Sequence, residues 1–129
     1  MVVSYRAGGY LAGEVAALTN LGLVYKELGR IRESLGMFES VLVINRELQD
    51  RAGEAATLGN LGLILLPMGD IQRAFQCHEQ SLTICCEIGD KRGEAHERSN
   101  IGIAYQLLGE YDKAQHEVER ALEIDRTLI

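Results

Sequence analysis

Apolar residues recur along this chain at helical spacing, and the whole pattern repeats every 40 residues. An apolar stripe with steps of three or four residues runs from Leu18 to Leu28 and predicts a helix over 13–28. After a short linker, a second stripe from Ile31 to Leu48 predicts an amphipathic helix. The two stripes return twice more and predict helices near 53–68, 71–88, 93–108 and 111–128.

Three copies of one unit account for most of the chain, at residues 12–51, 52–91 and 92–129. Eight positions carry the same residue in all copies, and in the first copy they are Gly13, Glu14, Asn20, Gly22, Gly29, Glu39, Leu42 and Ile44. Because one helical hairpin of this size cannot bury both of its faces, we expect an all-α fold of three stacked antiparallel hairpins, an α-solenoid. Residues 1–11 fit either the remnant of a preceding helix or a frayed N-terminal tail.

Single residues predict where each hairpin turns and packs. Gly29 follows the last apolar residue of its helix, the place of a left-handed C-terminal cap. Glu14 is expected in the first helical turn, where a carboxylate interacts favourably with the helix dipole. Gly22 and Ser34 are small residues midway along their helices, so the two axes should approach most closely there. Pro67 predicts a kink or an early end in its helix.

Composition and charge exclude several classes of function. The chain of 129 residues has a formal net charge of −6 and no basic run, which argues against a nucleic-acid or anionic-membrane partner. It has no stretch of about 18 apolar residues that would span a bilayer, and its first residues lack the features of a signal peptide. The three cysteines fall in one copy, so we expect no disulfide framework and a reduced, cytoplasmic setting.

The spacing of small and aromatic residues resembles that of a known family. Gly22, Tyr25, Ser34 and Phe38 stand where tetratricopeptide repeats carry Gly, Tyr, Ala and Phe. The 40-residue period and the tripeptide Leu-Gly-Asn at 58–60 look like the longer subclass of kinesin light chain and Pins/LGN-type adaptors. The early Trp and the closing Pro of the family are absent. The resemblance implies a right-handed superhelix that binds a protein or peptide.

In that family the first helix of every hairpin lines a concave groove. The side chains expected to line it here are Asn20, Asn60, Asn100, Leu23, Leu63, Ile103, Thr19, Ser99, Lys26, Gln106 and His96. Each asparagine amide offers two donors and one acceptor, and in the resembled adaptors such asparagines hold peptide main chain, while apolar groove residues would receive ligand side chains. A compatible alternative is that these amides tie helix to helix or satisfy local backbone. With only Lys26 and His96 as cations, a clamp for a terminal carboxylate is not expected.

Other candidate chemistry is weaker. Cys77, His78, Cys85 and Cys86 include zinc-ligand types, but Cys77 and His78 diverge by about 100° on a helix and do not converge on one point. His78 aligns with Phe38 of the first copy, so packing explains it better. No arrangement of a thiol, a base and an orienting group is evident. We expect no metal, no cofactor and no enzymatic activity.

The sequence thus predicts an interaction scaffold that binds an extended peptide segment of a partner protein in its concave groove. The last predicted helix leaves Val118, Leu122, Ile124, Leu128 and Ile129 without a covering helix. We therefore expect either a fragment of a longer array or self-association through the exposed ends. The alternative function is therefore structural: self-assembly into dimers or head-to-tail stacks through the end helices.

Overall fold

The computed structural model describes residues 9–128, and within that range it forms six α-helices and no strand. The helices are α2 (Gly9–Glu27), α3 (Ile31–Glu47), α4 (Arg51–Leu65), α5 (Ile71–Ile88), α6 (Lys91–Leu107) and α7 (Tyr111–Thr127). Short linkers make sequential helices antiparallel, so α2–α3, α4–α5 and α6–α7 form three hairpins. The two interpretations of residues 1–11 concern mainly 1–8, which lie outside the described residues.

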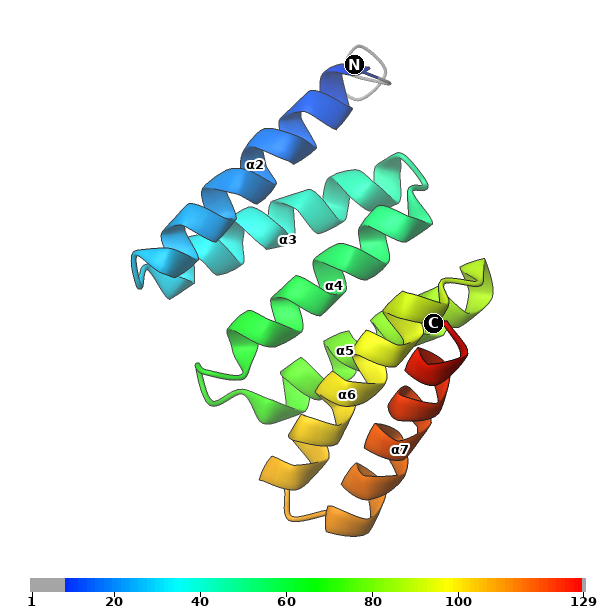
Figure 1. Cartoon of the computed structure of the whole chain (residues 1–129). Coiled ribbons are helices and arrows are strands. Elements are labelled where there is room, and N and C mark those ends of the chain that lie inside the picture. The colour runs from blue at the N-terminus through cyan, green and yellow to red at the C-terminus, as the bar shows by residue number, and fades with distance from the viewer. Residues whose placement is uncertain (1–8, 129) are drawn as a thin grey trace.

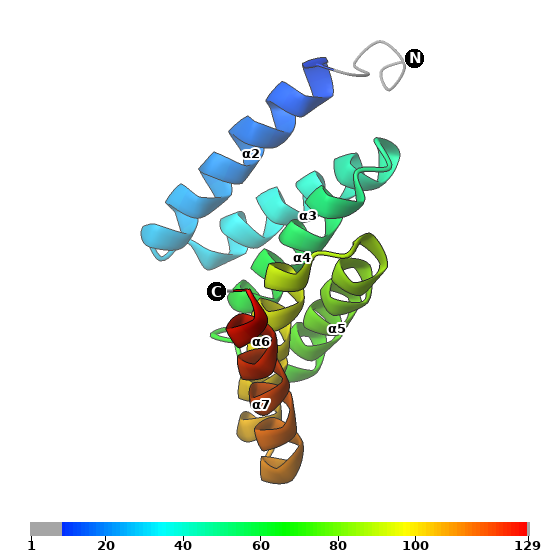
Figure 2. The same ribbon diagram turned by 45° about the vertical axis from the view of Figure 1, so that its right-hand side comes forward.

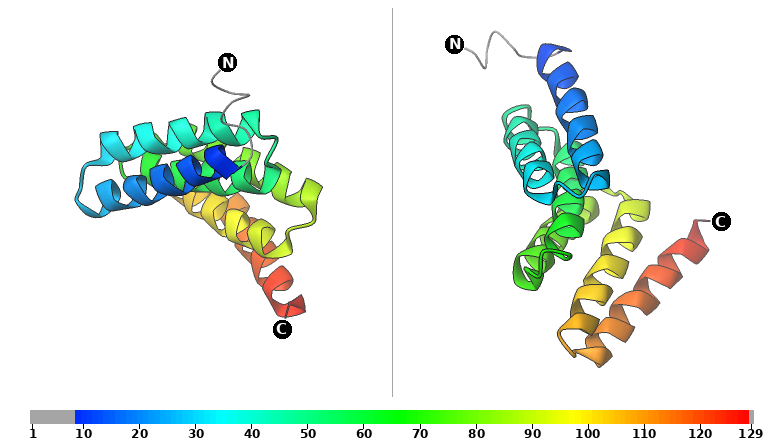
Figure 3. Two further views of the ribbon diagram at one scale, coloured as in Figure 1. Left: turned by 90° about the horizontal axis from the view of Figure 1, so that it is seen from above. Right: turned by 90° about the vertical axis from the view of Figure 1, so that its left-hand side faces the viewer.

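The hairpins stack in chain order, with α3 against α4 and α5 against α6. The first and last hairpins lie at opposite ends of the stack (Figures 1 and 2). Viewed from other sides, the α6–α7 hairpin is rotated relative to α2–α3 (Figure 3). The predicted all-α solenoid of three stacked hairpins is confirmed.

Aspartates define the start of three helices. Asp50, Asp70 and Asp90 immediately precede α4, α5 and α6, and each carboxylate accepts a hydrogen bond from a backbone N–H in the first turn. The start of α2 differs from our prediction, because this helix begins at Gly9, more than one turn before Glu14. The prediction that Glu14 lies in a first turn is therefore wrong, although the equivalent Glu54 and Glu94 do lie in the first turns of α4 and α6.

The ends of the first helices follow the sequence prediction. Gly29, Gly69 and Gly109 follow α2, α4 and α6 with φ angles of 78°, 86° and 78°, which a residue with a Cβ adopts only at a steric cost. Helix α4 ends at Leu65, two residues before Pro67, whereas α2 and α6 extend to the position equivalent to Pro67. The early end is confirmed. Leu66 keeps helical backbone angles and donates its N–H to the Gly62 carbonyl oxygen, but Pro67 has no N–H to donate to the Leu63 carbonyl oxygen, so the helix ends there.

The two helices of a hairpin meet at the small residues that the sequence singled out. The Ser34 hydroxyl donates a hydrogen bond of 2.7 Å to the Gly22 carbonyl oxygen. A Cβ on Gly22 would lie 2.9 Å from the Phe38 ring, so only glycine permits this approach. His78 packs in the same way against Gly62 in the second hairpin, and Val118 against Gly102 in the third.

Two buried apolar clusters join the first hairpin to the second. One buried cluster consists of Phe38, Leu61 and Ile64, and the other of Ala55, Leu58, Ile84 and Cys85. The partly buried Leu42 and Cys77 pack against both clusters. Because α4 packs against α3 and α5 together, its remaining face is directed away from the core, toward the space between α4 and α6.

Candidate functional site

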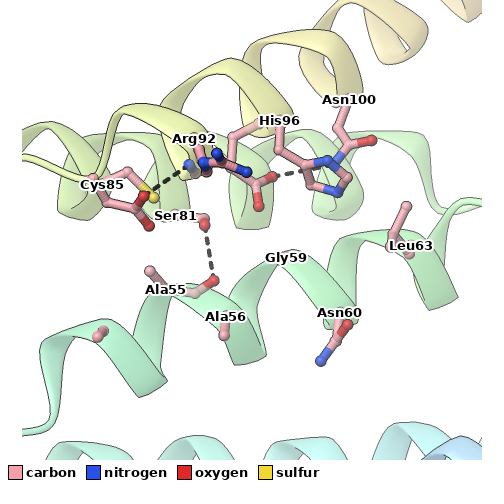
Figure 4. Close-up of a pocket in the computed structure, with 14 residues that line it drawn as sticks. Ala55, Ala56, Gly59, Asn60, Leu63, Ser81, Cys85, Arg92, His96 and Asn100 are labelled. Atoms are coloured by element: carbon pink, nitrogen blue, oxygen red, sulfur yellow. Dashed lines mark hydrogen bonds between the residues drawn. The ribbon is translucent and has the colours of Figure 1, made fainter. Parts of the chain in front are cut away.

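A pocket of about 450 Å³ opens between α4 and α6, the first helices of the second and third hairpins. Four side chains predicted for the groove line it: Asn60 and Leu63 from α4, and His96 and Asn100 from α6. In Figure 4 the residues of α6 lie across the pocket from those of α4. The structure therefore brings together residues that are about 40 positions apart in the sequence.

The two walls of the pocket differ in chemistry. On α4, the small residues Ala52, Ala56 and Gly59 line it and leave room for a ligand. On α6, Arg92, His96 and Asn100 follow one another at steps of four residues, which keeps them on one helical face. One wall is small and largely apolar, and the other is polar.

Glu97 joins three helices behind the polar wall. Its Oε1 accepts a hydrogen bond of 2.7 Å from Nδ1 of His78 on α5, whose side chain is 1% exposed. The same oxygen accepts a hydrogen bond of 3.3 Å from Nδ2 of Asn100. Its Oε2 lies against Gly59 of α4, at a place where a Cβ would collide with it. The buried carboxylate thus ties α4, α5 and α6 together at the pocket.

The recurring asparagines occupy different environments. Asn100 is buried and bonded to Glu97, as described above. Asn60 is half-buried, and no hydrogen bond involves its side chain within residues 9–128. Asn20 is exposed on α2 and does not line the pocket. The pocket therefore unites two of the three asparagines.

The remaining predicted groove residues lie outside the pocket lining. On α2, Leu23 is exposed, and Thr19 and Lys26 are half-buried. On α6, Ile103 and Gln106 are exposed. Ser99 is half-buried on the same helix.

Sequence reasoning missed two charged residues of α6 that line the pocket. Arg92 stands where the other copies have Ala12 and Ala52, and Glu97 stands where they have Ala17 and Thr57. Since neither position is the same in all copies, a search for recurring residues passes over both. The sequence did contain a signal for both residues, because each is charged at a position where the other two copies carry a small residue.

An ion-pair network joins α6 to α7, and its residues do not line the pocket. The Arg98 guanidinium bonds Glu94 at 3.1 Å and Glu117 of α7 at 2.8 Å. Burial alone would raise the pKa of the Glu94 carboxyl, but hydrogen bonds from Arg98 and Lys91 outweigh that effect, and the pKa is lowered from its ordinary value. Arg98 stands where the other copies have Leu18 and Leu58, so a polar contact between α6 and α7 replaces an apolar one in the third hairpin.

The cysteines are free thiols. Burial, assisted by the charges of Asp90 and Glu97, raises the pKa of Cys85 to about 11. Burial also raises the pKa of Cys77. Since the thiolate is the reactive form, both thiols are poor nucleophiles near neutral pH. In the described part of the chain, no group of three or more His, Cys, Asp or Glu side chains could hold a metal ion.

Comparison with known protein families finds a match over nearly the whole described chain. The model of the tetratricopeptide repeat matches residues 13–87 and, in a second alignment, residues 53–127. No curated protein matches. Among residues 9–128, none of the helices has the length and apolar character needed to cross a membrane.

Solved structures of helical-repeat proteins are similar to this fold. BtubC (BKLC) from P. vanneervenii is 25% identical with a TM-score of 0.83, over 88% of this chain and 47% of that one. The apo form of RapI is 25% identical with a TM-score of 0.85, over 89% of this chain and 42% of that one. The TPR domain of Arabidopsis FLU is 20% identical with a TM-score of 0.84, over 91% of this chain and 98% of that one. The chain thus spans less than half the length of the first and second of these structures.

Proposed function

Because the chain belongs to the tetratricopeptide repeat family, we propose that it holds an extended peptide segment of a partner protein in the groove between its first helices. Repeats of this family generally mediate protein–protein interaction and are typically non-enzymatic scaffolds. The observation that carries the proposal is the pocket between α4 and α6, lined by Asn60, Leu63, His96 and Asn100.

The size of the pocket suits a short stretch of peptide. Its volume of about 450 Å³ lies in the range of roughly 300–1,000 Å³ that is usual for ligand pockets. Leu23 on α2 and Ile103 on α6 are exposed apolar residues beyond the pocket. They would lengthen the contact in both directions along an extended ligand.

The unpaired polar groups of the pocket suit peptide main chain. Asn60 lines the pocket with its two donors and its acceptor unused within residues 9–128. Leu63 and Ala56 on the same helix would receive an apolar side chain of the ligand. Arg92 has no ion pair among the described residues and offers a charge to one acidic side chain of the ligand.

A pull-down from a lysate of the cells that make the protein tests this proposal. The variant Asn60→Ala/Asn100→Ala removes both amides that line the pocket, and Gln76→Ala/Gln80→Ala removes two exposed amides of α5 as a matched control. We expect the wild type and the control to retain a partner that the groove variant loses, with equal helicity in all three by circular dichroism. Identical partners for all three would refute the groove. Asn20→Ala then tests whether the contact reaches α2.

A second candidate function is self-assembly through the last helix. Leu42 on α3 packs against the core of the next hairpin, whereas the equivalent Leu122 on α7 is 47% exposed. This face would accept a helix from a second copy or from a following hairpin of a longer polypeptide. A mass by light scattering that rises with concentration in the wild type, and stays monomeric in Leu122→Glu, would support assembly. A monomer at every concentration would contradict it.

A cytoplasmic location is part of the proposal. It rests on the three free cysteines, which suit a reducing compartment.

A further inference from the structure

We infer that Glu97 is a positioning residue that fixes the side-chain amide of Asn100, so that the third repeat presents a hydrogen-bond acceptor to the ligand. The ligand must then supply a backbone N–H at that point. This inference rests on the proposed function, because it assigns the hydrogen-bond polarity of the same groove.

The geometry leaves one orientation for the Asn100 amide. Glu97 Oε1 lies 3.3 Å from Asn100 Nδ2 and also receives the His78 Nδ1–H at 2.7 Å. A carboxylate only accepts hydrogen bonds, so the NH₂ end of the amide has to face it. Turning the amide over would place the Asn100 carbonyl oxygen against the carboxylate, with two acceptors facing each other. The Oδ1 atom is therefore the end directed away from Glu97.

Burial makes this orientation costly to change. His78, Glu97 and Asn100 are all buried. A buried polar group that loses its partner forfeits its hydrogen bond without gaining one from water. Glu97 is itself held in place, because Gly59 leaves room for its Oε2 and His78 bonds its Oε1. Figure 4 shows Asn100 over the pocket with its bond to the glutamate drawn.

The first inter-repeat contact provides an internal comparison. Thr57 stands three residues before Asn60, as Glu97 stands three residues before Asn100. The Thr57 hydroxyl instead accepts a hydrogen bond of 2.7 Å from Asn45 Nδ2, and no bond involves the Asn60 side chain in the described chain. The Asn60 amide can therefore turn to offer either a donor or an acceptor. The two asparagines look identical in the sequence, yet they recognise a ligand differently.

The first copy suggests a double substitution that removes the hydrogen bond between Glu97 and Asn100. His78→Phe/Glu97→Thr gives the contact between the second and third hairpins the residue types of Phe38 and Thr57, which occupy the equivalent positions in the contact between the first and second hairpins. The Phe38 ring already packs against Gly22 as His78 packs against Gly62, so the larger ring has a precedent. The matched control is Glu94→Gln, which alters another buried carboxylate of α6 that does not line the pocket.

The first measurement needs no ligand. Exchange with water of the side-chain Nδ2 protons is followed by NMR for Asn60 and Asn100. In the wild type and in Glu94→Gln, we expect an Asn100 proton to exchange roughly tenfold more slowly than those of Asn60, as one hydrogen bond to a charged acceptor predicts. In His78→Phe/Glu97→Thr the difference should vanish. Equal exchange in the wild type, or a difference that survives this double substitution, would overturn the inference.

The second measurement probes the ligand. A phage-displayed library of random linear peptides is selected on the wild type, and binders that Asn60→Ala loses are kept. Each backbone N–H of one binder is then methylated in turn. We expect one position at which methylation weakens binding roughly tenfold on the wild type and far less on His78→Phe/Glu97→Thr. An equal loss on both proteins at every position would contradict the polarity.

The two measurements distinguish the orientation of the Asn100 amide from the binding of a peptide in the groove. A library without groove-dependent binders would count against the proposed function and against the ligand polarity together. The exchange rates would still decide whether Glu97 holds Asn100.

Discussion

Stacking between hairpins should make one leucine far more important for stability than its equivalent in another copy. Leu61 and Leu21 occupy the same position of the first helix in consecutive copies. Leu61 is 2% exposed, because α3 covers it, whereas Leu21 on α2 is 40% exposed. The substitutions Leu61→Ala and Leu21→Ala remove the same atoms from the same kind of helix, so they differ mainly in the coverage by a preceding hairpin.

The expected magnitudes follow from burial. Leu61→Ala loses the full transfer free energy and leaves a cavity beside Phe38 and Ile64, which costs about 2–5 kcal/mol. Truncating Leu21 leaves no enclosed cavity, because this side chain is 40% exposed. Burying a whole leucine contributes roughly 1.5–3 kcal/mol, so the buried three-fifths of Leu21 contributes about 1–2 kcal/mol. We expect the first substitution to cost about twice as much free energy of unfolding as the second.

Urea unfolding followed by circular dichroism measures both losses. The dependence on urea concentration should be the same for the two variants, because a changed slope would indicate loss of a single hairpin rather than of the whole array. The reasoning is refuted if the two variants lose equal stability with equal slopes, since stacking would then contribute nothing at the Leu61 position.

Three further predictions concern packing, reactivity and pH. Gly62→Ala should lower the free energy of unfolding by about 1–3 kcal/mol, because its Cβ would collide with the imidazole ring of His78. Gly36→Ala meets no atom and should raise the free energy of unfolding by about 0.5–1 kcal/mol; a loss of stability in both variants on urea unfolding would contradict the geometry. A thiol reagent at pH 8 should modify the exposed Cys86 quickly and the buried Cys85 only on unfolding, because burial raises the pKa of Cys85 to about 11. Mass spectrometry measures the two rates in the native protein, and equal rates would contradict the burial of Cys85. Because the pKa of Glu94 is lowered in the folded protein, its carboxylate stabilises the fold above about pH 4.5, the ordinary pKa, and this contribution disappears as the pH falls through the folded pKa. Glu94→Gln should therefore be less stable than the wild type at neutral pH, and the difference should shrink in acid. A difference that is constant with pH would refute this.

The fold could be predicted in most respects because it depends on residues that recur. Gly22 and its equivalents mark close approaches that the structure places against Phe38, His78 and Val118. The left-handed glycines after the first helices were predictable for the same reason. The start of α2 was not, because no aspartate cap marks a boundary there as Asp50 does for α4.

The candidate site was only partly predictable because its chemistry depends on residues that differ between copies. Asn60 and Asn100 were identified by their recurrence, and the pocket brings them together. The contact between His78 and Glu97 joins residues 19 positions apart on different helices, and only the packing of α5 against α6 reveals it. Arg92 escaped notice because helical periodicity does not indicate which charged residue faces a pocket.

The measurement that tests the central claim most directly is site-specific photo-crosslinking in cells. A benzophenone amino acid is placed at Ala56, which lines the pocket on α4, and in a second protein at Gln80, which is exposed on α5 outside that pocket. We predict that Ala56 crosslinks to a partner protein, that the crosslink maps to one short segment of it, and that Asn60→Ala reduces the yield. Crosslinks from Gln80 to the same partner, with none from Ala56, would show that the partner binds another face and would contradict the account.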